Sequence, residues 1–375
     1  MSGRRPHRPH APHRCPHAPH RCPHAPRRRP CPLASAALAA VLALTAAGCS
    51  AESRQDSVER TERAGRTGPS ALRGEADPTA SSPFWIDPES DAARQVTEWE
   101  KQGRTDDAKA LRRISERAVA DWPAGDNPEP GIRRAVRGAQ AAKRTAVFVA
   151  YNIPHRDCGL YSAGGAHDAQ SYRDWIGSFA AALGNAEAIV ILEPDAIPHL
   201  TDGCTPAEHH DERYELLAHA ISRLKQQPRT RVYLDAGNPD WIADPAKLTE
   251  PLRRAGIASA DGFSLNVSNF QTNDAVKAYG TRLSGLLGDV HFTIDTSRNG
   301  AGPLRGDRDE AWCNPPGRAL GSPPTTNTGN ELLDAYLWIK RPGDSDGPCR
   351  GGPAAGTWWP DYALGLARRS KDAIA

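Results

Sequence analysis

The sequence has no long hydrophobic run, and the part of the chain after residue 49 has no excess of basic residues. Its most apolar stretch, 33–47, is too short to span a bilayer comfortably, which favours an export signal over a membrane-spanning helix. The first 49 residues carry eight arginines and no Asp or Glu, which leaves 39 basic and 45 acidic residues in the remainder. The body of the protein is therefore mildly acidic and has no basic stripe, so we do not expect nucleic acid as a partner.

Closely spaced cysteines are also absent from the body of the chain. The four cysteines there are Cys158, Cys204, Cys313 and Cys349, and no two of them have C-x-x-C spacing. This spacing argues against a zinc site, whereas an even number of cysteines in an exported protein favours disulfides. Three connectivities exist, and we favour the sequential one because it closes two loops of similar size beside polar strand ends.

The N-terminal region divides into a leader and a linker. Residues 1–49 combine a Pro-, His-, Arg- and Cys-rich extension with the apolar stretch and the sequence AAGC, which resembles a lipoprotein box with Cys49 as the lipidated residue. Ordinary secretion with cleavage nearby is the alternative. Residues 50–82 contain no aromatic side chain and are typical of a disordered tether. We expect the ordered domain at 83–375, secreted or lipid-anchored at a bacterial cell surface.

Short apolar strands alternate with helical periodicity through the domain. We expect strands at 147–152, 189–195, 232–237, 263–268, 291–297 and 336–340. We expect helices at 96–120, 171–183, 208–225, 246–255 and 273–287. Because parallel neighbours need a crossover between them, this alternation predicts an α/β fold with a parallel sheet.

Polar residues recur at the ends of these strands. The stretch AIVILEPDA at 188–196 runs four aliphatic residues into Glu193, Pro194 and Asp195. A single carboxylate at such a position is usually structural. In a parallel β/α barrel, however, the carboxyl ends of the strands converge on one face, where active sites are built. Recurrence at nearly every strand therefore favours a site.

Four aspartates are candidates for acid–base chemistry: Asp157, Asp195, Asp235 and Asp346. Crowded carboxyls raise one another's pKa values, so one of them can stay protonated near neutral pH and act as a general acid. Aromatic faces beside carboxylates suit sugar rings. We expect core packing for at least two of five nearby tryptophans, with Trp338 the first of these; the five are Trp241, Trp312, Trp338, Trp358 and Trp359.

The motifs around these residues resemble those of glycoside hydrolase family 6, the bacterial cellulases that cut β-1,4-glucan with inversion. The resemblance covers about 84–375. It rests on seven motifs in order: YNIPHRDCGLYSAGG (151–165), ILEPDAI (191–197), YLDAG (233–237), NVSNF (266–270), IDTSRNG (294–300), WCNPPGRALG (312–321) and DAYLWIKRPGDSDG (334–347). The family fold that the resemblance implies is a distorted, incomplete, seven-stranded parallel β/α barrel.

The resemblance also implies roles for individual residues. Asp195 matches the catalytic acid, Asp157 the aspartate that raises the pKa of the acid and organises water, and Asp346 the proposed base. Arg156 would pair with the carboxylates, and Ser162 matches a position linked to the water. The matched glucan-binding positions are Tyr151, Asp235, Trp241, Asn266, Trp312 and Lys340. The disulfides of the family fall on Cys158–Cys204 and Cys313–Cys349.

Three positions depart from the family pattern. Asn238 stands where the family usually has His, and Asp344 replaces a substrate-contacting Glu. Gln95 takes the position at which some endo-acting members carry a sugar-stacking Trp. These changes concern contacts with the sugar and leave the acid in place.

The expected activity is inverting hydrolysis of internal β-1,4-glucosidic bonds by a monomer, without metal or cofactor. Inversion requires carboxyls about 6.5–9.5 Å apart, so that a water fits between them. The segments 300–312 and 313–349 are short. Short loops here favour an open cleft over the roofed cleft of an exo-acting cellobiohydrolase. The same residues are also compatible with a surface lipoprotein that binds glucan without cutting it, and with a metal-dependent barrel hydrolase.

Overall fold

The computed structural model describes residues 82–306 and 310–370. The predicted leader, and the predicted linker apart from Ser82, lie outside the described residues. No helix in the described part is long and apolar enough to cross a membrane.

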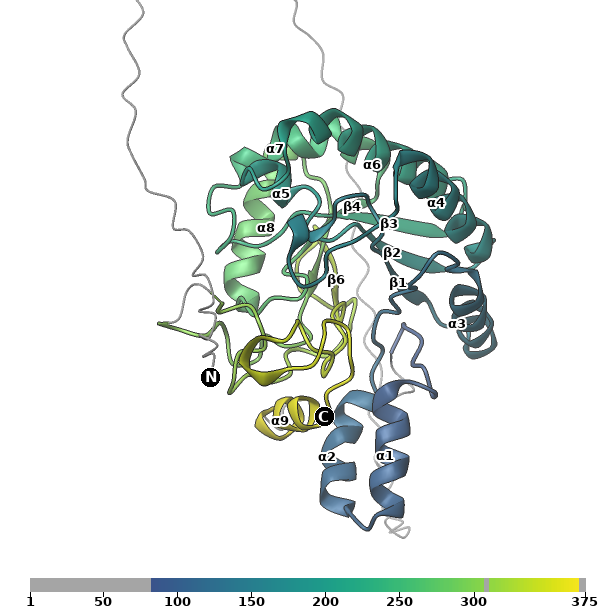
Figure 1. Ribbon diagram of the computed structural model, residues 1–375, viewed down its shortest axis with the longest axis vertical. Helices are drawn as coiled ribbons and strands as arrows, with labels where there is room; N and C mark the ends of the chain where they lie inside the picture. Colours follow the sequence, from purple (N-terminus) through teal and green to yellow (C-terminus); the bar gives the residue numbers. More distant parts are fainter. Residues whose placement is uncertain (1–81, 307–309, 371–375) are drawn as a thin grey trace, which may run out of the picture. The chain divides into compact units, whose positions relative to one another are not determined.

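Strands and helices alternate along the described chain, and Figure 1 shows the helices arranged around a curved sheet. The strands are β1 (Ala146–Ala150), β2 (Ala188–Leu192), β3 (Thr230–Asp235), β4 (Gly262–Leu265), β5 (Phe292–Asp295) and β6 (Leu333–Leu337). The α-helices are α1 (Asp91–Lys101), α2 (Thr105–Ser115), α3 (Glu129–Ala142), α4 (Ala169–Leu183), α5 (Pro198–Thr201), α6 (His210–Leu224), α7 (Ala246–Arg254), α8 (Asn273–Leu287) and α9 (Pro360–Arg369). Short 3-10 helices are η1 (Asp157–Gly159), η2 (Ala207–His209), η3 (Ile257–Ser259) and η4 (Cys349–Gly351).

The six strands are parallel and pair in chain order, from β1 to β6. The helices α4, α6, α7 and α8 agree with the predicted ones to within two residues at either end. The α/β fold with a distorted, incomplete parallel barrel is confirmed. Its six strands end at the same edge because parallel crossovers return the chain to the same side of the sheet.

Side chains of the strands alternate between two apolar clusters. Phe148 and Val190 belong to the cluster that packs against the outer helices. Their neighbours Val147, Val149 and Ile189 belong to a second cluster enclosed by the curve of the sheet. Both faces of these strands are thus buried, which is why the sequence shows continuous apolar runs rather than alternation.

A short extended segment, 118–122, closes the gap between the first and last strands. The backbone N–H of Ala120 donates to Trp338 O at 2.9 Å, and that of Asp121 donates to Val147 O at 2.9 Å. Val149 N in turn donates to Asp121 O at 2.8 Å. This segment takes the place of the expected seventh strand, so the described residues contain six full strands and one irregular closing segment.

The predicted helix at 96–120 is wrong in its extent. The region contains two helices, α1 and α2, which break at Gly103, where φ is +75°. The chain then leaves helical geometry after Ser115 and becomes the closing segment. Apolar side chains of α1, α2 and α9 pack together with Trp338, and this third cluster stabilises the pair of helices α1 and α2. Sequence periodicity missed α9 and α3.

Two glycines of α8 provide a matched test of packing between helix and sheet. We expect Gly280→Ala to lower the free energy of unfolding by about 1–3 kcal/mol, since overpacking forces neighbours to shift. A Cβ at Gly280 would lie 2.5 Å from the Phe292 ring, whereas a Cβ at Gly285 would meet no atom within 4 Å. Gly285→Ala should therefore raise stability by about 0.5–1 kcal/mol. Urea denaturation measures both, and equal effects would contradict the packing described.

Candidate active site

A groove of about 520 Å³ lies where the strand ends meet. It is lined by segments that follow all six strands, so the convergence expected from the sequence is present. Nine of the predicted site residues line it: Tyr151, Asp157, Ser162, Asp195, Asn238, Trp241, Trp312, Lys340 and Asp346. Four others do not: Arg156, Asp235, Asn266 and Asp344.

The turn after β2 presents Asp195 to the groove. Glu193 and Asp195 both have left-handed backbone, with φ of 47° and 72°. Such geometry is strained for non-glycine residues and persists only where the surroundings hold it. Here the fully buried Glu193 carboxylate accepts the backbone N–H groups of Asn152 and Ile153 at 3.0 Å. The end of β2 is therefore fastened to the end of β1.

Asp235 fastens the same turn from the other side. Its Oδ2 accepts the backbone N–H of Asp195 at 2.9 Å and that of Gly237 at 3.2 Å. The residue is 1% exposed, and burial, followed by the nearby Asp195, raises its pKa well above the usual value. Asp235 therefore lies outside the lining of the groove and holds the backbone of the turn that carries Asp195.

Asp195 has the properties of a general acid. Burial raises its pKa to about 6, and the neighbouring Asp157 adds to this rise. His199 and the Tyr151 hydroxyl, which donates to Asp195 Oδ2 at 3.4 Å, oppose it. A carboxyl with this pKa keeps its proton over much of the acidic range and still ionises near neutrality, as a proton donor must.

Asp157 lies beside Asp195 in the loop after β1. Its Oδ2 accepts the backbone N–H of Ser162 at 2.6 Å, and burial raises its pKa despite this bond. Arg156 does not pair with the carboxylates as expected. Its guanidinium donates to the carbonyls of Tyr151 at 2.7 Å and Ser162 at 2.8 Å, because the folded loop turns those carbonyls toward it. Arg156 therefore shapes the loop that carries Asp157.

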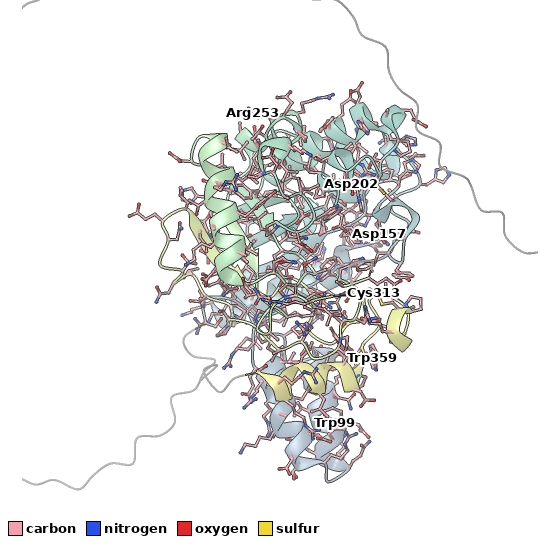
Figure 2. All side chains as sticks on the ribbon, turned by 90° about the vertical axis from the view of Figure 1, so that its left-hand side faces the viewer. Trp99, Asp157, Asp202, Arg253, Cys313 and Trp359 are labelled. Carbon is pink, nitrogen blue, oxygen red and sulfur yellow. A yellow bond between two sulfur atoms is a disulfide. The ribbon has the colours of Figure 1, made fainter. Side chains whose placement is uncertain are left out.

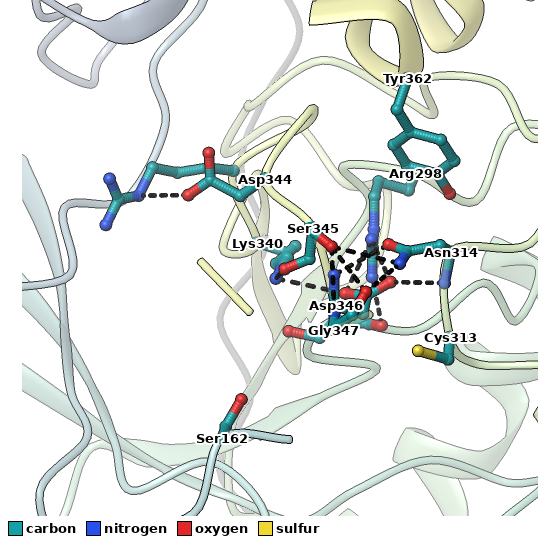
Figure 3. A network of polar contacts seen from close by, with 12 residues as sticks. Ser162, Arg298, Cys313, Asn314, Lys340, Asp344, Ser345, Asp346, Gly347 and Tyr362 are labelled. Carbon is teal, nitrogen blue, oxygen red and sulfur yellow. Dashed lines mark hydrogen bonds and ion pairs between the residues drawn. The ribbon is translucent and has the colours of Figure 1, made fainter. Parts of the chain in front are cut away.

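The pKa of Asp346 is shifted in the opposite direction to that of Asp195. Both oxygens of Asp346 accept from Arg298 Nη1, at 3.0 and 2.8 Å, and Lys340 Nζ lies 3.2 Å away (Figure 3). The backbone N–H of Asn314 adds a further bond at 3.0 Å. Burial alone would raise the pKa of Asp346, but the charges of Arg298 and Lys340 lower it below the usual range. The groove thus contains one carboxyl whose pKa is raised to about 6 and one whose pKa is lowered below its usual range.

Comparison with known proteins assigns the chain to a family. The sequence model of glycosyl hydrolases family 6 matches residues 79–370. The chain belongs to glycosyl hydrolases family 6. It is 38% identical to endoglucanase A of Cellulomonas fimi over 78% of its own length and 63% of that protein. It is 40% identical to endoglucanase A of Thermobispora bispora over 76% of its own length and 62% of that protein. The chain thus spans about three fifths of the length of these relatives.

A solved structure of the same family is similar throughout the domain. The endoglucanase Cel6 of Mycobacterium tuberculosis is 42% identical, and the superposition has a TM-score of 0.71 over 78% of this chain and 99% of that one. That structure was determined in complex with methyl-cellobiosyl-4-deoxy-4-thio-β-D-cellobioside. Family 6 membership thus agrees with the fold and with the paired carboxyls described above.

Two further predicted substrate contacts of this family 6 chain lie outside the groove. Asp344 is paired with Arg341 at 3.4 Å and lines a separate cavity of about 210 Å³ with Trp358; Figure 3 shows it apart from the Asp346 network. The amide of Asn266 is fully buried and donates to Asp295 O at 2.9 Å. Asn266 therefore supports the groove wall from beneath, because its left-handed backbone turns the side chain inward.

The tryptophans divide between groove and core. Trp241 and Trp312 line the groove, whereas Trp338 is buried, so the expected core role of Trp338 is confirmed. Trp358 packs against the α1–α2–α9 cluster. Sequence reasoning missed Trp122, which lines the groove and contacts the Tyr151 ring edge-on at 5.6 Å. The available signal was its place at the end of the short, mostly apolar stretch AVADW at 118–122, which resembles a strand.

Two further residues of the site were also missed. Arg298 lies within the motif IDTSRNG, and sequence reasoning gave it no role, although a buried cation beside a carboxylate sets the charge of that carboxylate. His199 follows EPDAIP and lines the groove, and a ring nitrogen lies within 4.8 Å of oxygens from Asp157 and Asp195. These three groups already hold protein partners, so we treat them as a proton-carrying cluster and assign no metal to them.

The structure contains the two sequential disulfides. Cys158 is joined to Cys204, and Cys313 is joined to Cys349. The first bond ties the residue after Asp157 to the loop after α5. The second lies next to Asn314, whose side chain and backbone hold the Asp346 loop. Each disulfide therefore stiffens one wall of the groove.

The raised pKa of Glu193 makes a prediction about stability. Burial raises this pKa to about 7, above the 4.5 that is usual for Glu, so the folded state binds a proton more tightly than the unfolded state. Stability from this group is present at low pH and is lost as pH rises toward 7. We expect Glu193→Gln to gain about 1–3 kcal/mol relative to wild type between pH 5 and pH 8.

Chemical denaturation at the two pH values measures this change. Glu187→Gln is the control, because Glu187 lies just before β2 but its side chain is 52% exposed. The control should show no such pH-dependent difference from wild type. An equal response of the two variants would show that the buried carboxyl does not titrate as described.

Proposed function

We propose that the protein hydrolyses internal β-1,4-glucosidic bonds in cellulose or soluble β-glucan, with inversion at the anomeric carbon. One observation carries this proposal: two carboxyls of the same groove have pKa values moved in opposite directions, that of Asp195 to about 6 and that of Asp346 below its usual range. Acid and base assignments follow from such pairs.

The reaction follows from these charges. Asp195 protonates the glycosidic oxygen as the bond from that oxygen to the anomeric carbon breaks. A water adds to the opposite face of the sugar, and Asp346 accepts the proton that the water loses. Asp157 supports the acid, since its charge raises the pKa of Asp195. The product is a sugar whose anomeric centre has changed from β to α, and Asp346 returns its proton to solvent.

The walls of the groove suit a glucan. Trp122, Trp241 and Trp312 supply apolar faces, while Asn238 and Lys340 supply polar groups at the same groove. Sugar rings need this combination, because their faces are apolar and their edges carry hydroxyls. The relatives named endoglucanase support cutting at internal bonds over release from chain ends. We also propose that the protein acts as a monomer, and that proton transfer by the groove carboxyls needs no cofactor.

We expect Asp195→Asn to lower kcat on cello-oligosaccharides at least 100-fold, because general acid catalysis contributes about 10²–10⁴-fold. Wild-type activity should fall as pH rises through about 6, where Asp195 loses its proton. Proton NMR of fresh product should show the α anomer first. Asp240→Asn is a matched control on the groove rim, with its side chain outside the acid cluster.

Three outcomes would contradict the proposal. Equal background release in wild type and Asp195→Asn would indicate a glucan-binding protein. Initial β anomer would exclude inversion. A fall in carboxymethyl-cellulose viscosity no faster than the rise in reducing ends would indicate an exo-acting enzyme.

We also propose that the chain is exported and tethered through lipidated Cys49. The apolar stretch before AAGC supports this, as do the two disulfides, which are typical of exported proteins. We expect wild type to partition with the membrane fraction of a bacterial host, and Cys49→Ala to appear in the soluble or secreted fraction. If wild type and Cys49→Ala were distributed alike between the two fractions, the protein would not be tethered through Cys49.

A further inference from the structure

His199 lies between Asp195, the proposed acid, and the carboxylate of Asp202. It lies on the short helix α5 directly after the turn that carries Asp195, and only 6% of the residue is exposed. A ring nitrogen of His199 and one carboxylate oxygen each of Asp157 and Asp195 lie within 4.8 Å of one another. A titratable, nearly buried ring thus faces both carboxyls of the acid cluster.

Asp202 holds this ring from behind. Nδ1 of His199 lies 3.3 Å from Asp202 Oδ2, and the same oxygen accepts the Trp241 Nε1–H at 2.8 Å. The backbone N–H of Cys204 donates to Asp202 Oδ1 at 2.8 Å. Burial would raise the pKa of Asp202, but these hydrogen bonds, with His199 first among them, lower it overall. Asp202 is therefore a fixed negative charge behind the imidazole.

A second contact, with the ring of Trp241, also restricts the imidazole of His199. The two rings meet edge-on, with centroids 4.8 Å apart. Cys204, which holds Asp202, is bonded to Cys158, the residue after Asp157. Asp157 and Asp202 lie on the same side of the molecule in Figure 2. The imidazole, its anchor and both carboxyls thus belong to one braced unit.

We propose that His199 is a positioning residue for the acid: held by Asp202, it fixes the Asp157–Asp195 pair beside Trp241 and sets the upper pH at which Asp195 keeps its proton. This inference rests on the proposed hydrolysis. A ring nitrogen of His199 lies within 4.8 Å of an Asp195 oxygen, and the electrostatic interaction between the two groups lowers the pKa of Asp195. Without His199, the acid would keep its proton to higher pH.

The other charged or titratable groups around Asp195 cannot replace this effect. Tyr151 and Asp157 approach from the loop after β1, Asp235 from β3, and Asp202 from the turn after α5. Each of these is neutral or negative. Lys340 lines the same groove but is paired with Asp346 at 3.2 Å, which compensates its charge.

The test compares wild type with His199→Asn, which keeps a donor for Asp202 but removes the titratable ring. We expect carbon NMR of the Asp195 carboxyl to show its titration midpoint at least half a pH unit higher, about a threefold change in the protonation constant. This measurement needs no turnover, so it decides the inference even if the proposed hydrolysis fails. His199→Gln is the second variant, in case the first does not fold.

Kinetics provide an independent readout. For cellotetraose, the alkaline limb of kcat against pH should move up by the same amount. For 2,4-dinitrophenyl β-cellobioside, whose leaving group departs without a proton, the limb should not move with the variant. A purely structural role would instead lower kcat for both substrates and leave the limbs in place.

His291→Asn is the matched control. His291 also bonds an aspartate through Nδ1, Asp334 Oδ1 at 2.8 Å, but it lies just before β5, outside the groove. The control should leave the titration of Asp195 and both pH profiles unchanged. An Asp195 midpoint that is unchanged or lower in the folded His199 variants would overturn the inference.

Discussion

Buried carboxylates at strand ends hold the active-site edge of this barrel together. Glu193 accepts backbone N–H groups from the end of β1, and Asp235 accepts the N–H of Asp195 after β2. Asp295 at the end of β5 accepts those of Ser268 after β4 and Lys340 after β6. Where parallel strands stop, their amides lose sheet partners, and an unpaired buried amide is costly. The carboxylates satisfy these amides and at the same time fix the positions of neighbouring loops.

This arrangement explains how a strained turn can present Asp195, the proposed acid. Asp195 has left-handed backbone, and its N–H is held by one buried carboxylate while the preceding Glu193 is held by the end of β1. The side chain of Asp195 is then free to face the groove. Burial that supports the turn also raises the pKa of the acid, so the same packing creates both its position and its protonation state.

The two carboxyls proposed as acid and base differ because their neighbours differ. Asp346 is surrounded by Arg298 and Lys340, whose charges outweigh its burial. For Asp195, burial is the largest influence on the pKa, and the neighbouring Asp157 adds to the rise. The disulfide between Cys158 and Cys204 braces the acid side, and that between Cys313 and Cys349 braces the ionised side. Opposite electrostatic environments therefore coexist across one groove.

The sequence was enough to predict the parallel α/β architecture, since apolar strands alternate with four periodic helices. It also determined which strand ends carry Asp195 and Asp346, because these motifs are local. The folded arrangement was needed to show which strand-end carboxylates face the groove and which, like Asp235, hold backbone. It alone placed Arg156 on carbonyls, Asp344 in another cavity, and His199 and Trp122 beside the acid. These outcomes depend on contacts between residues distant in the chain, whereas a sequence pattern reports only local spacing.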